Sequence, residues 1–308
     1  MSSTSGTPDP TASFELYRRR LLGLAYRMLG SLADAEDAVQ ETYVRWHGTK
    51  RDKVADPRAF LMTTTTRICL DALKSARAPR EEYVGPWLPE PVLDTAALAP
   101  DSRTELAEDL SIALLLTLDR LTPLERAAFL LHDVFDFSFN EVAAALDRSE
   151  AACRKLAVRA REHVRAVRPR GATAPPTRPG EIDAKHARLL SVFMAATQAD
   201  VTALTQLLAS DVRVVTDGGG KVRAALNVIE GADRVAQFVV NAARPHEGQW
   251  WRDDFTPRFA IINGLPGVIV EAPEGTMQTA AFEITGDIIR AMYVVRNPEK
   301  LRHLATRA

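Results

Sequence analysis

Two proline-rich segments divide this 308-residue sequence into three blocks. The first segment, Ala78 to Pro100, contains five prolines; the second, Arg168 to Gly180, contains four prolines and two glycines. Proline removes a backbone donor and pushes the preceding residue out of the helical conformation, so both segments are predicted to be linkers. The expected domains are residues 12–77, 105–167 and 181–308, joined by linkers over 78–104 and 168–180.

Charge is balanced over the whole chain but concentrated locally. There are 39 Lys and Arg residues against 40 Asp and Glu, a net charge of −1. A protein that binds DNA tightly by itself usually has a basic excess, because phosphate neutralisation supplies most of the non-specific affinity. We therefore expect the free chain to bind DNA weakly. Between Arg148 and Arg170, however, eight basic residues accompany two acidic ones, a local net charge of +6 (8 − 2).

The cysteines, the histidines and the N-terminus together predict a cytosolic protein without a metal or cofactor. Cys69 and Cys153 fall in predicted helices of different domains, with no partner at disulfide or metal-ligand spacing, and the six histidines are dispersed. Residues 1–10 lack the basic region and apolar core of a secretion signal. No apolar run approaches the roughly 18 residues that span a bilayer.

The segment 34–46 has the pattern of an amphipathic helix. Ser31, three residues before Asp34, is placed as an N-cap. Spacings of three and four predict one buried stripe, made of Ala35, Ala38, Val39, Thr42, Tyr43 and Trp46. The opposite face then carries an acidic ridge, which consists of Asp34, Asp37, Gln40 and Glu41. Such a ridge repels DNA and suits a basic protein surface.

A second helix is predicted from Asp56-Pro57, an N-cap followed by proline at the first helical position, to about Ala76. One sector of it carries a polar, mostly basic strip suited to a DNA backbone: Arg67, Asp71, Lys74 and Arg77. The short polar loop from Thr49 to Asp56 can form the lip of a pocket for an unstacked base. The alternative is that the strip is only a solvated helix face.

The second block has the pattern of a helix-turn-helix. Capping boxes occur at Thr122–Glu125 and Ser138–Glu141. Phe139–Leu146 is predicted to be a short helix, 147–149 a turn, and Glu150–Val167 a second helix, whose N-terminal part would enter a major groove. Two side chains are placed to reach base edges, Arg154 and Lys155, and three further along to meet phosphates, Arg159, Arg161 and Arg165. A solvated basic face is again the alternative.

The third block reads as an α+β domain in which a curved sheet wraps helices. A helix is expected over Ile182–Gln198, followed by a shorter one capped by Asp200. Alternating, β-branched stretches then predict strands at Val212–Thr216, Arg258–Asn263, Val268–Glu271, Thr276–Thr285 and Ile288–Arg296. Gly286-Asp287 is a plausible hairpin turn between the last two of these strands.

Residues 13–167 resemble the two conserved domains of an extracytoplasmic-function (ECF) RNA polymerase sigma factor. The resemblance rests on the segment 34–46, the helix after Asp56-Pro57, and the segment from Leu121 to Arg161, which match in order and separation. It implies a sigma-2-like bundle and a sigma-4-like helix-turn-helix, both all-α. The acidic ridge would bind the β′ clamp helices of core RNA polymerase, which also includes the β subunit, and the near-neutral charge fits promoter reading within holoenzyme.

The same resemblance implies two promoter-reading sites. The −10 element would be read and opened by the helix from Pro57 and its leading loop, with contacts from Arg58, Arg67, Asp71, Lys74 and Arg77. The −35 element would be read by Arg154, Lys155, Arg159 and Arg161. The family often has an Arg-Asn pair in the −10 helix where this chain has Thr66-Arg67, so the preferred −10 sequence is not predicted.

Residues 182–308 are similar to SnoaL-like domains of the NTF2-like class, an extension found in the ECF41 group of these factors. Three segments carry this second resemblance. They are Trp87-Leu88-Pro89-Glu90-Pro91 in the linker, Asp217-Gly218-Gly219-Gly220-Lys221, and Asn297-Pro298-Glu299-Lys300-Leu301, with Glu299 the only substitution. An apolar tryptophan in a proline-stiffened linker suits docking. The preferred hypothesis is therefore that the extension folds back on the linker and regulates the factor in cis.

Two alternatives for the extension stay open. One is an enzyme fused to a transcription factor, with Tyr293, His186, His246 and His303 as candidate groups, although no acid–base pair is evident from spacing. The other is a pocket for a small apolar ligand, bounded by Trp250, Trp251 and Phe255.

A different class of function for the whole chain is a one-component regulator that binds an operator without polymerase. The acidic ridge and the neutral net charge argue against it. No membrane contact is expected.

Overall fold

The computed structural model describes residues 10–75, 83–93, 98, 110–167, 192, 198–243, 254–273 and 275–304. The chain forms two compact units, each of which is discontinuous in sequence. The helical unit contains residues 1–78 and 95–172, and the C-terminal unit contains residues 79–94 and 173–308. Among the described residues, no helix is both long enough and apolar enough to span a bilayer.

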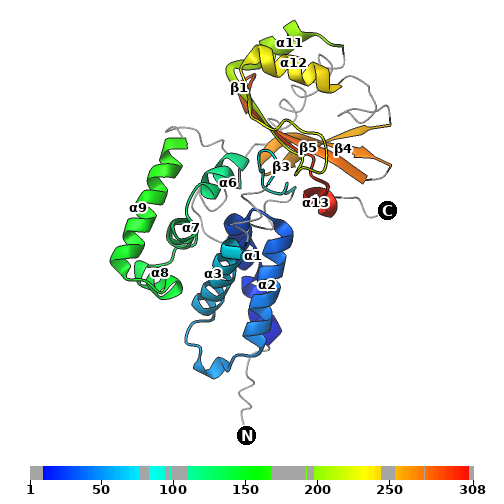
Figure 1. Ribbon diagram of the computed structural model, residues 1–308. Coiled ribbons are helices and arrows are strands. Elements are labelled where there is room, and N and C mark those ends of the chain that lie inside the picture. Colours follow the sequence, from blue (N-terminus) through cyan, green and yellow to red (C-terminus); the bar gives the residue numbers. More distant parts are fainter. Residues whose placement is uncertain are drawn as a thin grey trace. The chain divides into compact units, whose positions relative to one another are not determined.

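The helical unit begins with a bundle of three helices, α1 (Pro10–Leu29), α2 (Leu32–His47) and α3 (Pro57–Ser75), with a short 3-10 turn, η1 (Arg51–Lys53), before α3 (Figure 1). Ser31 caps α2 as predicted, because its side chain accepts a hydrogen bond from the Asp34 amide. The predicted stripe of α2 is buried except for Tyr43, which is half-buried. Trp46, 1% exposed, packs against Phe60 of α3 with ring centroids 5.6 Å apart.

The second part of the helical unit contains α6 (Ile112–Asp119), α7 (Pro123–Phe129), α8 (Phe139–Leu146) and α9 (Glu150–Val167). Both predicted capping boxes are present, at the starts of α7 and α8. The bounds of α8 and α9 are those predicted for the helix-turn-helix. An unpredicted feature is η3 (Leu130–Val134), a π-helical turn that continues α7. Such turns are common at functional sites.

The C-terminal unit is built on a six-stranded sheet with the order β2-β1-β6-β5-β4-β3. The strands are β1 (Leu208–Asp217), β2 (Ile229–Glu230), β3 (Thr256–Ile262), β4 (Leu265–Ala272), β5 (Gly275–Thr285) and β6 (Ile288–Val295). The β1–β6 pair is parallel, and the other pairs are antiparallel. The Gly286 turn joins β5 to β6 as predicted, with Gly286 at φ +58°.

The described part of this unit also contains the helical segments α11 (Val201–Leu207), capped by Asp200, α12 (Ala232–Ala243), and α13 (Pro298–Leu301), which leads into the 3-10 turn η4 (Arg302–Leu304). The two-residue β2 and the helix α12 were not predicted, although the apolar spacing of Val235, Ala236 and Val240 fits a helix. The predicted strand Val212–Thr216 lies inside a longer β1. The predicted helix Ile182–Gln198 falls largely outside the described residues.

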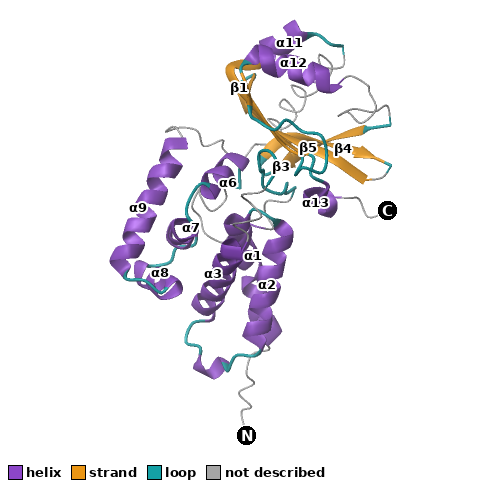
Figure 2. Ribbon diagram, viewed as in Figure 1, coloured by secondary structure: helices purple, strands orange, loops and turns teal. Residues whose placement is uncertain are grey.

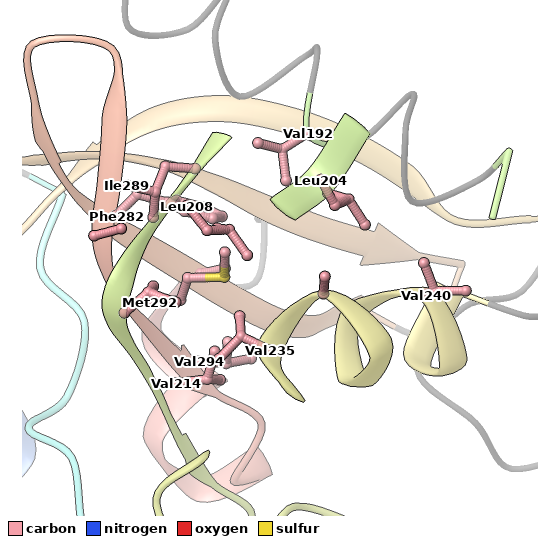
Figure 3. Close-up of a cluster of buried hydrophobic side chains, with 14 residues drawn as sticks. Val192, Leu204, Leu208, Val214, Val235, Val240, Phe282, Ile289, Met292 and Val294 are labelled. Atoms are coloured by element: carbon pink, nitrogen blue, oxygen red, sulfur yellow. The ribbon is translucent and has the colours of Figure 1, made fainter. Parts of the chain in front are cut away.

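The core of the C-terminal unit lies between the sheet and its helices. Figure 2 shows α11 and α12 over one face of the strands. Figure 3 shows the buried cluster on that face, in which Val235 of α12 lies beside Val214 and Val294 of the sheet. Alternate residues of β1 and β6 supply this face, because strand side chains point to opposite sides in turn. The C-terminal end of β1 and the segment that follows β6 carry the polar residues described below.

Candidate functional site

The acidic ridge is an exposed face of α2. Asp34, Asp37, Gln40 and Glu41 are all exposed, while the opposite face of the helix is packed into the bundle. Glu41 pairs with Arg45 one turn later, at 2.9 Å between Oε1 and Nε, and both side chains are about half exposed. The ridge therefore presents carboxylate and amide oxygens on a rigid helix, as an interaction surface for a basic partner requires.

Two arginines of α3 contact the second part of the helical unit. Arg58 donates from Nη2 to the Phe135 carbonyl at 2.6 Å, and its guanidinium lies 4.7 Å from the centre of the Phe137 ring. Arg67 donates to the carbonyls of Ala145 and Ala144, at 3.0 and 2.9 Å. These carbonyls belong to the last turn of α8, where backbone acceptors lack intrahelical partners. Residues predicted to contact the −10 element thus join the two helical parts in this structure.

The rest of the predicted −10 strip has a different environment. Lys74 and Asp71 form an ion pair at 2.9 Å, with side chains 74% and 73% exposed. The pair leaves the strip nearly neutral at this point. Arg77 lies outside the described residues.

The predicted −35 residues divide into an exposed group and a paired one. Arg154, Lys155 and Arg159 are exposed on α9, opposite a buried stripe that includes Cys153, Ala157 and Ala160. Arg161 is only 29% exposed and donates from Nε to Asp133 of the π turn at 2.8 Å. Arg161 therefore fixes α9 to η3 in addition to any contact that it makes with a phosphate.

The three motifs of the predicted regulatory site meet in the C-terminal unit. We call their meeting point the linker clamp, defined by Leu88 of the linker, Asp217 at the end of β1, and Lys300 of α13. The Leu88 amide donates to Asp217 Oδ2 at 2.8 Å, and the Leu88 carbonyl accepts from Lys300 Nζ at 2.5 Å. Lys300 and Asp217 also form an ion pair at 2.7 Å. Both polar backbone groups of one linker residue are therefore bound by one ion pair.

The clamp is shielded from solvent. The Asp217 side chain is 0% exposed and that of Lys300 is 9% exposed, and Leu88, Pro89, Glu90 and Pro91 are all buried. The Lys300 ammonium lies 4.4 Å from the Trp87 ring centre and 5.0 Å from that of Tyr83. Two aromatic rings and a carboxylate therefore compensate a buried positive charge, which would otherwise be strongly unfavourable. Trp87 acts here as a cation-binding ring as well as an apolar contact.

Tyr83 is a clamp residue that sequence reasoning missed. Its hydroxyl donates to Asp217 Oδ1 at 2.5 Å and accepts from Asn297 Nδ2 at 3.0 Å. Burial, together with the hydrogen bond to Asp217, raises the pKa of the Tyr83 phenol above its ordinary value. The hydroxyl therefore stays protonated at neutral pH, as a donor to Asp217 must be.

Asn263 and His303 are two further contacts without a sequence signal. The Val92 amide donates to Asn263 Oδ1 at 3.1 Å, and the Asn263 amide donates to the Val92 carbonyl at 2.8 Å. His303 donates from Nε2 to the Pro91 carbonyl at 2.7 Å. Both side chains bind backbone groups of the linker, so no particular linker side chain predicts these contacts. Asn263 occupies a left-handed conformation at φ +50° in the β3–β4 turn, which asparagine tolerates well.

The glycines of the Asp217–Lys221 segment are required by close approach. A Cβ at Gly219 would lie 2.3 Å from Asn297 Nδ2, and one at Gly218 would lie 2.4 Å from the Val222 carbonyl oxygen. Gly219 and Gly220 have φ of +59° and +70°. Lys221 at the end of the segment pairs with Glu299 of α13. The glycines of this loop therefore permit its close approach to Asn297 and to the Val222 carbonyl.

Asn297 and Pro298 set the position of Lys300. Asn297 caps α13 by accepting from the Glu299 amide at 3.1 Å, and Pro298 follows at the first helical position. The amides of Arg296 and Asn297 donate to the Asp217 carbonyl, at 2.7 and 3.0 Å. The end of β6 and the start of α13 are thus attached to β1, which brings the ammonium and the carboxylate together.

Of the residues considered for catalysis or for ligand binding, the structure describes only some. The Tyr293 hydroxyl donates to Glu283 at 2.9 Å, and burial together with the charge of Glu283 raises the pKa of this phenol. Phe255 is buried, whereas Trp250, Trp251, His186 and His246 lie outside the described residues. In the part of the chain that the structure describes, no cluster of histidine, cysteine and acidic residues is arranged to hold a metal ion.

Comparison with known proteins identifies the class to which this architecture belongs. The model of sigma-70 region 2 matches residues 14–78, and that of sigma-70 region 4 matches residues 111–164. The second match contains α8 and α9 up to residue 164, and the first contains the acidic ridge and α3. The helical unit is therefore that of a sigma factor, a subunit that binds core RNA polymerase and promoter DNA.

Full-length relatives define the family more closely. The ECF RNA polymerase sigma factor SigJ of Mycobacterium tuberculosis is 37% identical over 298 residues, covering 94% of this chain and 92% of that protein. The probable ECF sigma factor SigI of that species is 28% identical, covering 95% of each. The crystal structure of SigJ superposes with a TM-score of 0.67 at 32% identity, covering 95% of this chain and 98% of that one.

This chain belongs to the family of ECF RNA polymerase sigma factors. It is an alternative sigma factor that binds core RNA polymerase and directs transcription initiation at promoters. Its C-terminal domain, with the mixed six-stranded curved sheet, is NTF2-like, as predicted. The alternative of a one-component regulator is not favoured.

Proposed function

We propose that the C-terminal unit regulates this sigma factor in cis by holding the linker between the two promoter-reading regions. The observation that carries the proposal is the linker clamp, in which Asp217 and Lys300 bind the amide and the carbonyl of Leu88. Linker residues fixed in this way cannot form an extended connection between the region that reads the −10 element and the region that reads the −35 element. The state of the clamp would therefore limit the separation at which the −10 and −35 elements are read.

The contacts inside the helical unit support the same proposal. Arg58 and Arg67 cannot donate to the carbonyls of Phe135, Ala144 and Ala145 and to promoter DNA with the same N–H groups. We infer that they exchange these carbonyls for the −10 element when the two helical parts separate in holoenzyme. Arg154, Lys155 and Arg159 need no such exchange, because they are exposed already.

The remaining roles are proposed as follows. The acidic ridge binds the β′ clamp helices, and the helix-turn-helix reads the −35 element with Arg154, Lys155, Arg159 and Arg161. The protein acts in the cytoplasm, where core polymerase is. The C-terminal domain serves as a regulator and not as an enzyme, in agreement with full-length relatives that are sigma factors. A small apolar ligand bound by this domain, near Phe255, would be the natural signal.

The regulatory proposal is tested with Asp217→Ala in the full chain. Breaking the clamp should change transcription from a cognate promoter by core polymerase, relative to the wild type, in either direction. Asp211→Ala is the matched control, because Asp211 lies on the same strand with its side chain 81% exposed and only a 3.9 Å pair to Arg290. Equal output from all three proteins, with the Asp217 variant folded by circular dichroism, would reject regulation through the clamp.

The acidic ridge is tested separately by reversing its charge. Asp37→Lys combined with Glu41→Lys should lower the affinity for core polymerase by about tenfold or more, because like charges would then face each other. Glu36→Lys is the control, since Glu36 is exposed on α2 but lies off the ridge. Affinity is measured by competition with a labelled sigma factor. Unchanged affinity in the double variant would show that this face does not bind polymerase.

A further inference from the structure

Arg154, a proposed reader of the −35 element, is held in place by neighbours on two helices. It is the fifth residue of α9, and its side chain is 58% exposed. Its Nη2 donates to Glu150 Oε2 at 3.0 Å, one turn earlier. Its guanidinium lies 4.6 Å from the centre of the Phe139 ring of α8. The side chain is therefore exposed to a partner and yet restricted in direction.

Phe139 is itself fixed. It is the first residue of α8, directly after Ser138, whose side chain and amide are both bound in the capping box with Glu141. The His132 ring stacks on the Phe139 ring, with centroids 3.9 Å apart and planes 29° apart. His132 is in turn held by a 2.7 Å hydrogen bond between Nδ1 and the Phe137 carbonyl. The π turn, α8 and α9 are thus linked through His132, Phe139 and Arg154.

This arrangement suits a base-reading arginine. A guanidinium has five N–H donors in a rigid fork, and contact with an aromatic face uses none of them. Glu150 engages one Nη2 hydrogen, so the other donors remain for a partner. An arginine whose direction is already set loses less conformational entropy when it binds, which improves both affinity and geometric selectivity. The usual partner of such an arginine in a major groove is guanine, bound through O6 and N7.

We propose that Phe139, supported by His132, is a positioning residue that directs Arg154 to a guanine of the −35 element. The inference rests on the proposed DNA-reading role of α9 and extends it to a side chain that carries no charge. It predicts that an aromatic ring at position 139 affects discrimination at one base of the promoter. A purely structural role for the ring would instead affect binding to all promoter sequences equally.

The test uses holoenzyme reconstituted from the full chain and a promoter set in which each −35 position is varied in turn. Arg154→Ala first identifies the position that this arginine reads, as the one where discrimination between guanine and other bases falls by about fivefold or more. Phe139→Leu keeps an apolar side chain without an aromatic face. It should reduce discrimination at that same position by about two- to fivefold.

Two further variants make the result specific. Phe139→Tyr keeps the ring and should retain the discrimination of the wild type. In the Arg154→Ala background, Phe139→Leu should cause no additional loss at the identified position, because there is then no arginine to position. Thermal unfolding of each variant checks that the helix-turn-helix is folded.

Each other outcome has a definite meaning. If Arg154→Ala alters discrimination at no position, the DNA-reading role of Arg154 is wrong, and the positioning role of Phe139 is wrong with it. If Arg154→Ala acts at one position but Phe139→Leu weakens all promoters equally or has no effect, the function of α9 stands and the inference about Phe139 is overturned.

Discussion

The linker clamp of the C-terminal unit and the arginine contacts of the helical unit use the same chemistry in different surroundings. In both, a cationic side chain donates to main-chain carbonyls: Lys300 to Leu88 in the clamp, and Arg67 to Ala144 and Ala145 in the helical unit. The clamp ion pair is at most 9% exposed, whereas Arg67 is an exposed residue.

Because the clamp is buried and Arg67 is exposed, the contacts of the clamp should break less readily than those of Arg67. A buried charge that loses its partner is left uncompensated, so the clamp should open only as a cooperative event. An exposed arginine can exchange a carbonyl for water or phosphate at little cost, because solvent screens it in both states. The helical unit therefore has contacts suited to exchange with DNA, and the C-terminal unit has contacts suited to holding one state.

The largest effect is expected from removing the cation of the clamp. Lys300→Met keeps the aliphatic stem and should lower the free energy of unfolding by about 3–5 kcal/mol, since Asp217 would remain buried without its cation. Lys221→Met is the matched control, because its pair with Glu299 is roughly half exposed and should contribute less than about 1 kcal/mol. Urea unfolding measures both; equal effects would show that burial does not distinguish the two ion pairs.

A smaller effect is expected from the glycine that allows the clamp to close. Gly219→Ala should destabilise the protein by about 1–3 kcal/mol, because it combines a left-handed conformation with a Cβ placed against Asn297. Gly286→Ala has nearly the same φ, +58°, but no heavy atom within 4 Å of its Cβ. The difference between the two variants in urea unfolding isolates the close approach. A larger loss at Gly286 would contradict the packing described for Gly219.

The contacts of the helical unit that we expect to exchange with DNA are tested through the arginines of α3. Arg67→Ala should cost only about 1 kcal/mol of unfolding free energy, since the hydrogen bonds of an exposed side chain are largely replaced by bonds to water. The same variant should increase the distance between fluorophores attached to α3 and α8. Lys74→Ala, which changes another exposed cation of α3, should leave that distance as in the wild type. A shorter or unchanged distance in Arg67→Ala would show that this arginine does not hold the two helical parts together.

The smallest effect concerns the two buried cysteines of the helical unit, which belong to neither set of contacts. Burial raises the pKa of the Cys69 thiol to about 12, and burial also raises that of Cys153. Because the thiolate is the reactive form, both should react slowly with a thiol reagent at pH 8 until the protein is unfolded. Any stability that the raised pKa of the Cys69 thiol contributes is present below the pKa that this thiol has in the unfolded protein. It is lost as the pH rises towards 12. Rapid labelling of the native protein would contradict this.

Much of the local structure could be predicted from sequence, because its causes are local. The capping boxes at Thr122 and Ser138 and the cap at Ser31 lie within three residues of the groups that they bind. The bounds of α8 and α9 follow from such signals and from apolar periodicity. By contrast, the π turn at Leu130–Val134 and the two-residue β2 have no such signal and were missed.

The candidate site was only partly accessible to the same reasoning. Its three motifs were identified by resemblance, but Tyr83, Asn263 and His303 belong to none of them. Asn263 and His303 bind linker backbone, which every linker sequence offers, and the hydroxyl of Tyr83 completes a network centred on Asp217. Spacing along the chain carries no information about such contacts.

The sequence alone was enough to predict most of the helices and strands, and that one helix face is acidic and another basic. Which distant groups meet became evident only from the folded chain. Leu88 and Asp217 are 129 positions apart, and Arg67 lies 78 positions from the Ala145 carbonyl that it binds. The physical reason is that caps and periodicities act within a few residues, whereas the partner of a buried charge is set by how complete elements pack.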